Sequence, residues 1–220
     1  MKNRNYGNQD EKEKTRQLTE AEQRRLEKFE QLSDRMLQDG YRRSELTVSI
    51  VKANVFAIVL MVPVMIIGFV LFFLKNGLDA SDFRGGHSLI FLVAFLVLIV
   101  VHELVHGLSW SFYTPHGFQD IEFGFMKQYL TPYCTCSVPL SKGQYIFGAL
   151  MPLVLLGIIP MVVGILCGSM LVLLLGIVMT VSAAGDIMIV WNILRYKSHA
   201  SEIAYIDHPT QAGGVIFEKD

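Results

Sequence analysis

Three residues, His102, Glu103 and His106, form the pattern His-Glu-x-x-His, whose residue types and spacing suit metal-dependent hydrolysis. On an α-helix, residues four apart lie on one face, so the two imidazoles can reach a single tetrahedral Zn²⁺. Zinc lowers the pKa of a bound water toward ~7, and the neighbouring glutamate can take the proton of that water as general base and later pass it to the leaving amine. The pattern therefore predicts a zinc peptidase site with His102 and His106 as ligands and Glu103 as the catalytic base.

The apolar residues around this motif make it a more specific indication of a metal site than its five positions alone. Residues 88–101 are apolar, and continuing through the motif to Tyr113 gives a segment long enough to span a membrane. Two histidines and a glutamate inside such a span are costly to bury unless they are paired or bound to a metal. Two other interpretations stay open, namely a hydrogen-bonded cluster between helices and a proton relay in a transporter.

A catalytic zinc site needs three protein ligands and a fourth position for water. Asp186 is the best candidate for the third ligand, because it is the only charged residue between Lys142 and Arg195. The small residues at 182–185 would let its helix approach another helix closely. The alternative for Asp186 is a carboxyl that stays protonated or pairs with Arg195 or Asn192.

The segment 115–141 contains other residues that could bind the metal. These competing ligands are Glu122, His116 and the pair Cys134 and Cys136, which are spaced like residues on one face of a strand. Gly and Pro residues interrupt this segment, and β-like stretches lie around 121–125 and 133–138. We expect a short β-hairpin or a re-entrant insertion here.

The elements that must position these residues are apolar helices. Four segments are long and apolar enough to cross a membrane, at about 53–74, 88–113, 144–166 and 169–194. Gly164, Gly168 and Ser169 mark the turn between the last two. The sequence therefore predicts an all-α integral membrane protein with about four transmembrane helices.

The two ends of the chain are predicted to lie outside the apolar region. Residues 17–40 carry a capping-box pattern at Thr19 to Glu22 and helical apolar spacing, which indicates an amphipathic helix. Its mixed charges also fit a solvated helix resting on its own loops. We divide the chain into an N-terminal tail (1–52), a membrane metalloprotease domain (53–195) and a C-terminal tail (196–220). The tail residues Asp207 and His208 receive no role.

Charge and composition limit where the protein can be located and which partners it can bind. Hydrophobic residues make up 52% of the 220 residues and mean hydropathy is +0.41, as in membrane proteins. Of 19 Lys and Arg, only Lys75 and Arg84 lie between the first two spans, so the positive-inside rule predicts a multi-pass cell-membrane protein with both termini cytosolic. A net charge of −1 argues against nucleic acid as a partner. Three cysteines make a disulfide framework unexpected, and the apolar stretch that begins near Ala53 is interpreted as a retained anchor.

Several short motifs, taken in order, resemble a known family. They are His102 to Gly107, Phe123-Gly124-Phe125, Thr131-Pro132-Tyr133-Cys134, Ala149 to Pro152, Gly185-Asp186 and Asp207-His208-Pro209. The chain resembles a bacterial family described as zincin membrane peptidases, the domain of unknown function numbered 3267, which is itself similar to the site-2 proteases. The resemblance spans residues 40–220.

The resemblance implies roles for four residues. In site-2 proteases a helix supplies two histidine ligands and the general-base glutamate, and a later transmembrane helix supplies an aspartate ligand. These roles fall on His102, His106, Glu103 and Asp186. The sequence lacks the Asn-x-x-Pro-x-x-x-x-Asp-Gly element of site-2 proteases, since Gly185 precedes the aspartate.

We therefore expect a zinc-dependent, membrane-embedded endopeptidase that acts on a peptide bond in or near the bilayer, toward its cytosolic half. The rival interpretations are a non-catalytic scaffold or regulator and a metal or proton transporter using the same buried residues. The expected partners are a membrane protein or peptide substrate and the lipid bilayer; the sequence does not determine the oligomeric state. A peptide must be extended to be cut, and residues 119–126 could hold it by β-augmentation or could be an ordinary loop.

Overall fold

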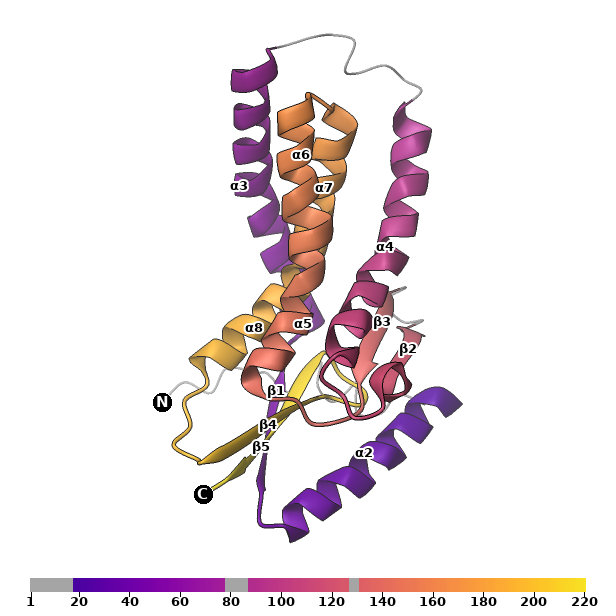
Figure 1. Cartoon of the computed structure of the whole chain (residues 1–220), viewed down its shortest axis with the longest axis vertical. Coiled ribbons are helices and arrows are strands. Elements are labelled where there is room, and N and C mark those ends of the chain that lie inside the picture. The colour runs from indigo at the N-terminus through magenta and orange to yellow at the C-terminus, as the bar shows by residue number, and fades with distance from the viewer. Residues whose placement is uncertain (1–17, 78–86, 127–130) are drawn as a thin grey trace.

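The computed structural model describes residues 18–77, 87–126 and 131–220, and Figure 1 shows two unlike ends of one elongated molecule. Long helices fill one end, while a small sheet, a β-hairpin and one polar helix fill the other. Most of the loop expected between the first two spans lies outside the described residues.

The apolar end is built from helices at the four predicted spans. They are α3 (Ile50–Asn76), α4 (His87–Ser111), the continuous run of α5 (Lys142–Pro152), the π-helical turn η3 (Leu153–Ile158) and α6 (Ile159–Cys167), then α7 (Met170–Ser182) and α8 (Ala184–Arg195). Among the described residues, three helices are long and apolar enough to cross a membrane, and four if α7 and α8 count as one broken span.

Glycine allows α6 and α7 to touch backbone to backbone. A Cβ atom at Gly164 would lie 2.4 Å from the Leu173 nitrogen, and one at Gly176 would lie 2.4 Å from the Met161 nitrogen. α3 packs on this pair through Phe72, which is fully buried. Small residues thus allow these apolar helices to pack with their backbones in contact.

The fourth predicted span is two helices rather than one. α7 and α8 meet at Ala183 with a bend of 45°. The Ser182 hydroxyl donates to the Val178 carbonyl at 2.9 Å, a contact that competes with the helix ladder and often bends helices. Ala183 and Ala184 are buried at the bend, where larger side chains would not fit. The prediction of one continuous helix at 169–194 was therefore wrong at this point.

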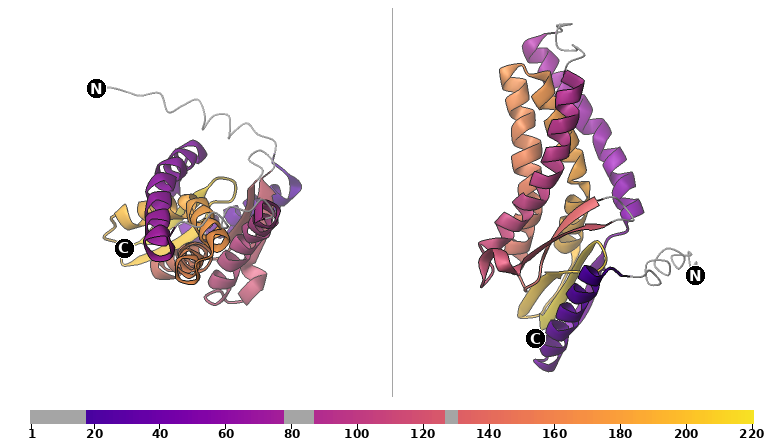
Figure 2. Two further views of the ribbon diagram at one scale, coloured as in Figure 1. Left: turned by 90° about the horizontal axis from the view of Figure 1, so that it is seen from above. Right: turned by 90° about the vertical axis from the view of Figure 1, so that its right-hand side faces the viewer.

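The polar end joins both ends of the chain in one sheet, which the sequence did not predict. β1 (Arg42–Thr47) and β4 (Glu202–Asp207) each pair antiparallel with the central strand β5 (Gly213–Lys219). α2 (Glu20–Gln38) lies across this sheet (Figure 2), with Phe29 and Met36 packed on β4 and β5. The two segments predicted as separate tails therefore form one folded unit.

Local predictions at the polar end are confirmed. Thr19 caps α2 in a reciprocal capping box with Glu22, and Gly40 follows the helix with φ 91°. The middle insertion is a hairpin of β2 (Ile121–Met126) and β3 (Thr131–Cys136), preceded by the 3-10 turn η2 (Gly117–Asp120).

The hairpin packs directly on α4 at Gly107. A Cβ atom there would lie 2.6 Å from Phe123 Cζ and 2.9 Å from Ile121 Cγ2. The glycine that follows the second motif histidine is therefore the position at which the hairpin approaches the motif helix.

Candidate metal centre

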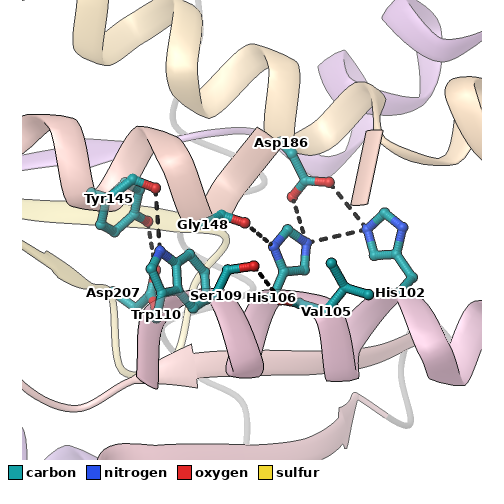
Figure 3. A network of polar contacts seen from close by, with 9 residues as sticks. All are labelled: His102, Val105, His106, Ser109, Trp110, Tyr145, Gly148, Asp186 and Asp207. Carbon is teal, nitrogen blue, oxygen red and sulfur yellow. Dashed lines mark hydrogen bonds and ion pairs between the residues drawn. The ribbon is translucent and has the colours of Figure 1, made fainter. Parts of the chain in front are cut away.

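The structure brings His102, His106 and Asp186 together, although 80 residues separate Asp186 from His106 (Figure 3). The two histidines lie one turn apart on α4, and Asp186 lies in the first turn of α8. His102 Nε2 is 3.2 Å from His106 Nε2 and 3.2 Å from Asp186 Oδ2. His106 Nε2 is 3.5 Å from Asp186 Oδ1.

These separations suit one tetrahedral ion. With zinc-ligand bonds near 2.1 Å, two ligand atoms at the tetrahedral angle lie about 3.4 Å apart. His106 Nδ1 is 2.9 Å from the Gly148 carbonyl, which can only accept, so Nδ1 carries a proton and, in the neutral ring that binds a metal, Nε2 presents a lone pair. That lone pair faces a carboxylate, an arrangement that a cation stabilises. The three residues therefore fit a zinc ion.

Packing fixes the ring of His106. The Trp110 ring stacks on it with centroids 5.2 Å apart and an interplanar angle of 15°. Trp110 Nε1 in turn donates to the Tyr145 carbonyl at 3.2 Å. A Cβ atom at Gly148 would lie 2.1 Å from Trp110 Cδ1, so only glycine leaves room for this ring. Sequence reasoning did not identify Trp110, Tyr145 and Gly148 as part of the site. In the sequence, Trp110 only follows the motif, and Tyr145 and Gly148 only lie in the predicted span 144–166.

The bend between α7 and α8 sets the position of Asp186. If α7 continued without a bend, Asp186 would lie on the extension of the α7 axis. Instead, α8 begins after the bend at Ala184, two residues before Asp186, and runs in a different direction. A carboxylate in the first turn of a helix is favoured by the helix dipole and the unpaired N–H groups there. The break therefore gives Asp186 both its place beside α4 and a favourable local field.

Glu103 lies in the same cavity, which has a volume of about 250 Å³ and also contains the three candidate ligands. The Glu103 carboxylate faces the backbone N–H of Cys134, on β3. The hairpin therefore holds the candidate base against the ligand group. This contact could not be read from the sequence, since it joins α4 to a strand about 30 residues away.

The other candidates from the middle segment are not in the ligand group. Glu122 forms an ion pair with Lys28 at 2.6 Å, and His116 lies 3.2 Å from Asp120. Cys134 and Cys136 are buried free thiols, and burial raises the pKa of both, which disfavours the thiolate that binds metals. Of the residues weighed from the sequence, only Asp186 joins the histidines.

Two residues of the C-terminal segment line the cavity without having been predicted to do so. Asp207 accepts hydrogen bonds from the Tyr145 hydroxyl and from the Cys136 N–H at 2.7 Å, and burial raises the pKa of Asp207 to about 6. His208 Nδ1 accepts from the Gln211 N–H at 3.0 Å, and burial lowers the pKa of His208 to about 4. Asp207 is therefore partly protonated near neutral pH, and His208 is neutral.

Residues 95–201 match the model of a family described as "Putative zincin peptidase", the domain of unknown function 3267. The match confirms the resemblance to this family, and it covers the part of α4 that carries the motif and all of α8, with Asp186. No curated protein and no solved structure matches the chain. The family description supports a metallopeptidase, and its zincin type implies zinc.

Proposed function

We propose, from the premise that residues 95–201 match a zincin peptidase family, that this chain is a zinc-dependent endopeptidase embedded in the membrane. The observation that carries the proposal is the convergence of three ligand atoms from His102, His106 and Asp186 in one cavity with the carboxylate of Glu103. Metal-dependent hydrolysis uses this combination of a metal site and an adjacent base.

Each residue has a defined task in this proposal. His102, His106 and Asp186 would hold the ion, which supplies Lewis acidity when bound. Glu103 takes a proton from the attacking water and gives it to the leaving amine. The Cys134 N–H keeps the Glu103 carboxylate directed into the cavity, and the Gly148 carbonyl keeps His106 in the tautomer with a free Nε2.

The surface of the apolar end supports a place in the bilayer. Large apolar side chains are exposed along α3 and α4, where water would be unfavourable. They include Ile58, Val62, Ile66, Leu89, Val93 and Val97. The ligand group lies toward the sheet-bearing end of α4, so the peptide bond would be cut near the membrane border, on the side that carries both termini.

The substrate would lie along β3 rather than along the predicted segment 119–126, because β3 lines the cavity from Thr131 to Thr135 and β2 contributes only Met126. In an antiparallel pair, alternate residues direct their backbone groups outward. The N–H groups of Cys134 and Cys136 face outward, to Glu103 and Asp207. The outward carbonyls at Pro132 and Cys134 are then available to an extended peptide.

The test combines metal content with cleavage. Purified wild type, His106→Ala and Asp186→Ala are analysed by inductively coupled plasma mass spectrometry, and wild type and Glu103→Gln are incubated with a peptide library and analysed by mass spectrometry. We expect about one zinc per wild-type chain, loss of zinc in both ligand variants, and retained zinc without cleavage in Glu103→Gln.

Other results would reject the proposal. Full zinc in Asp186→Ala would place the third ligand elsewhere. Zinc without any cleavage by wild type would favour a scaffold, and ion flux in proteoliposomes that depends on these four residues would favour a transporter.

A further inference from the structure

Arg25 is a cationic side chain for which the proposed reaction has no role, although it lines the cavity that contains the motif residues. It lies on α2 and faces the turn after β4 and the hairpin. Its Nε donates to the Pro209 carbonyl, and its guanidinium carbon is 4.4 Å from the centroid of the Tyr133 ring. These two contacts hold the guanidinium at the cavity wall.

Arg25 differs from its neighbours on the same helix in having no carboxylate partner within the described part of the chain. Arg24 lies 3.8 Å from Glu20, and Lys28 lies 2.6 Å from Glu122. Arg24 is also largely exposed, whereas Arg25 is half-buried. A half-buried guanidinium that forms no ion pair is costly, so its presence at a cavity wall points to an anionic ligand.

The carboxyl group of Asp207, which lines the same cavity wall, already accepts hydrogen bonds on both of its oxygens. Asp207 uses one oxygen for the Tyr145 hydroxyl and the other for the Cys136 N–H, and it forms no ion pair with Arg25. Burial raises the pKa of Asp207 to about 6 and the charge of Arg25 lowers it only in part, so the two side chains interact electrostatically without forming an ion pair. The four N–H groups on the two terminal nitrogens of Arg25 therefore lack a carboxylate partner in the described structure.

We propose that Arg25 binds a carboxylate of the peptide substrate, from an acidic side chain near the scissile bond or from the C-terminus of the peptide. A guanidinium recognises a carboxylate through two parallel hydrogen bonds, which gives both affinity and orientation. The inference rests on the proposed peptidase function and adds a substrate class to it. α2 then belongs to the substrate site, as the element that carries its cation.

The experiment uses the full-length, zinc-loaded chain and paired peptides from the library. One pair differs by Glu or Gln near the cleaved bond, and the other by a free or amidated C-terminus. We expect wild type to prefer one acidic member by about tenfold in kcat/KM, the size of one charge-assisted contact. Arg25→Gln should make the two members equal, while Arg24→Gln, the matched control, should keep the preference.

The pair that shows the preference identifies the source of the carboxylate. Equal cleavage of both pairs by wild type, or an unchanged preference in Arg25→Gln, would overturn the proposal. A lower unfolding temperature in Arg25→Gln with the preference intact would also overturn it, since this is the result expected of a purely structural contact.

A binding measurement separates this inference from the proposed function. Fluorescence anisotropy of the same labelled peptides with Glu103→Gln, and with the double variant carrying Arg25→Gln, needs no turnover. If wild type cleaves no peptide, the proposed function fails, whereas loss of the acidic preference in the double variant would still assign carboxylate binding to Arg25. Equal binding of both members by Glu103→Gln would refute it.

Discussion

At the scale of single residues, the candidate metal centre depends on groups that orient its ligands. His106 is held by a carbonyl on one side and by the Trp110 ring on its face. Asp207 and His208 lie in the same cavity with pKa values shifted in opposite directions by burial. These residues lead to two predictions.

Replacing Trp110 by Ala should weaken zinc binding by about 10- to 100-fold, because the stack on His106 and the hydrogen bond to the Tyr145 carbonyl are both lost. The measurement is zinc affinity by competition with a chelator. Trp191→Ala is the control, since Trp191 is 57% exposed and is the other tryptophan of the chain. Equal zinc affinity in Trp110→Ala and wild type would contradict this role.

The dependence of stability on pH should change in opposite directions in Asp207→Asn and His208→Asn. Asp207 has a pKa raised to about 6, so the folded state binds its proton first and gains stability as pH falls from about 6 toward 4. His208 has a pKa lowered to about 4, so the unfolded state binds its proton first and the folded state loses stability as pH falls from about 6.5 toward 4.

The measurement is the unfolding temperature of each variant minus that of wild type, in detergent, between pH 4 and 7. This difference should fall on acidification for Asp207→Asn and rise for His208→Asn. Parallel curves for both variants would show that burial does not shift these two groups.

At the scale of elements, the hairpin and the bend between α7 and α8 assemble the site. The bend at Ala183 directs Asp186 toward α4, and the hairpin directs the Cys134 N–H to Glu103. At Gly107 the hairpin packs against α4 with no room for a Cβ atom, so the lack of a side chain there has a measurable consequence.

Gly107→Ala should destabilise the protein by about 1–3 kcal/mol, as overpacking does, because the added Cβ would overlap Phe123 and Ile121. Displacing the hairpin should also move the Cys134 N–H from Glu103 and lower cleavage. The unfolding temperature and the cleavage rate measure the two effects. Gly143→Ala, where no atom lies within 4 Å, should leave both unchanged. An unchanged unfolding temperature in Gly107→Ala would show that the hairpin can shift freely.

At the scale of the whole molecule, an apolar helical end is joined to a polar end that contains the first and the last described strands, β1 and β5. β5, the central strand, connects β1 from before the first long helix to β4 from after the last one. If the helices cross a bilayer, this sheet requires both chain ends to lie on one side. Cys167, exposed at the far end of α6, would lie on the other side.

Labelling with a membrane-impermeant maleimide tests this arrangement in intact cells. Cys167 should react without permeabilisation, because cytosolic termini place the α6–α7 turn outside. In a Cys167→Ser background, Ser201→Cys, next to β4, should react only after permeabilisation. The reverse pattern would invert the orientation, and labelling of both positions only after permeabilisation would contradict a membrane-spanning arrangement.

The sequence by itself determined the local features of this protein. The His-Glu-x-x-His spacing, the apolar segments, the capping box of α2 and the hairpin all depend on residues close in sequence, where periodicity and side-chain type act directly. The family resemblance was also carried by such short motifs. The domain boundaries, the membrane orientation and the catalytic roles stay predictions.

The tertiary structure alone decided which distant residues meet. Asp186 reaches the histidines because α7 ends at Ser182 and α8 begins after a bend at Ala183, beside the hydrogen bond from Ser182 to the Val178 carbonyl. Arg25 and Asp207 line the cavity because β1 and β4 pair with β5, which brings α2 and the end of β4 to the motif residues. Local patterns carry little information on such contacts, since they depend on the shapes of surfaces formed only after the chain has folded.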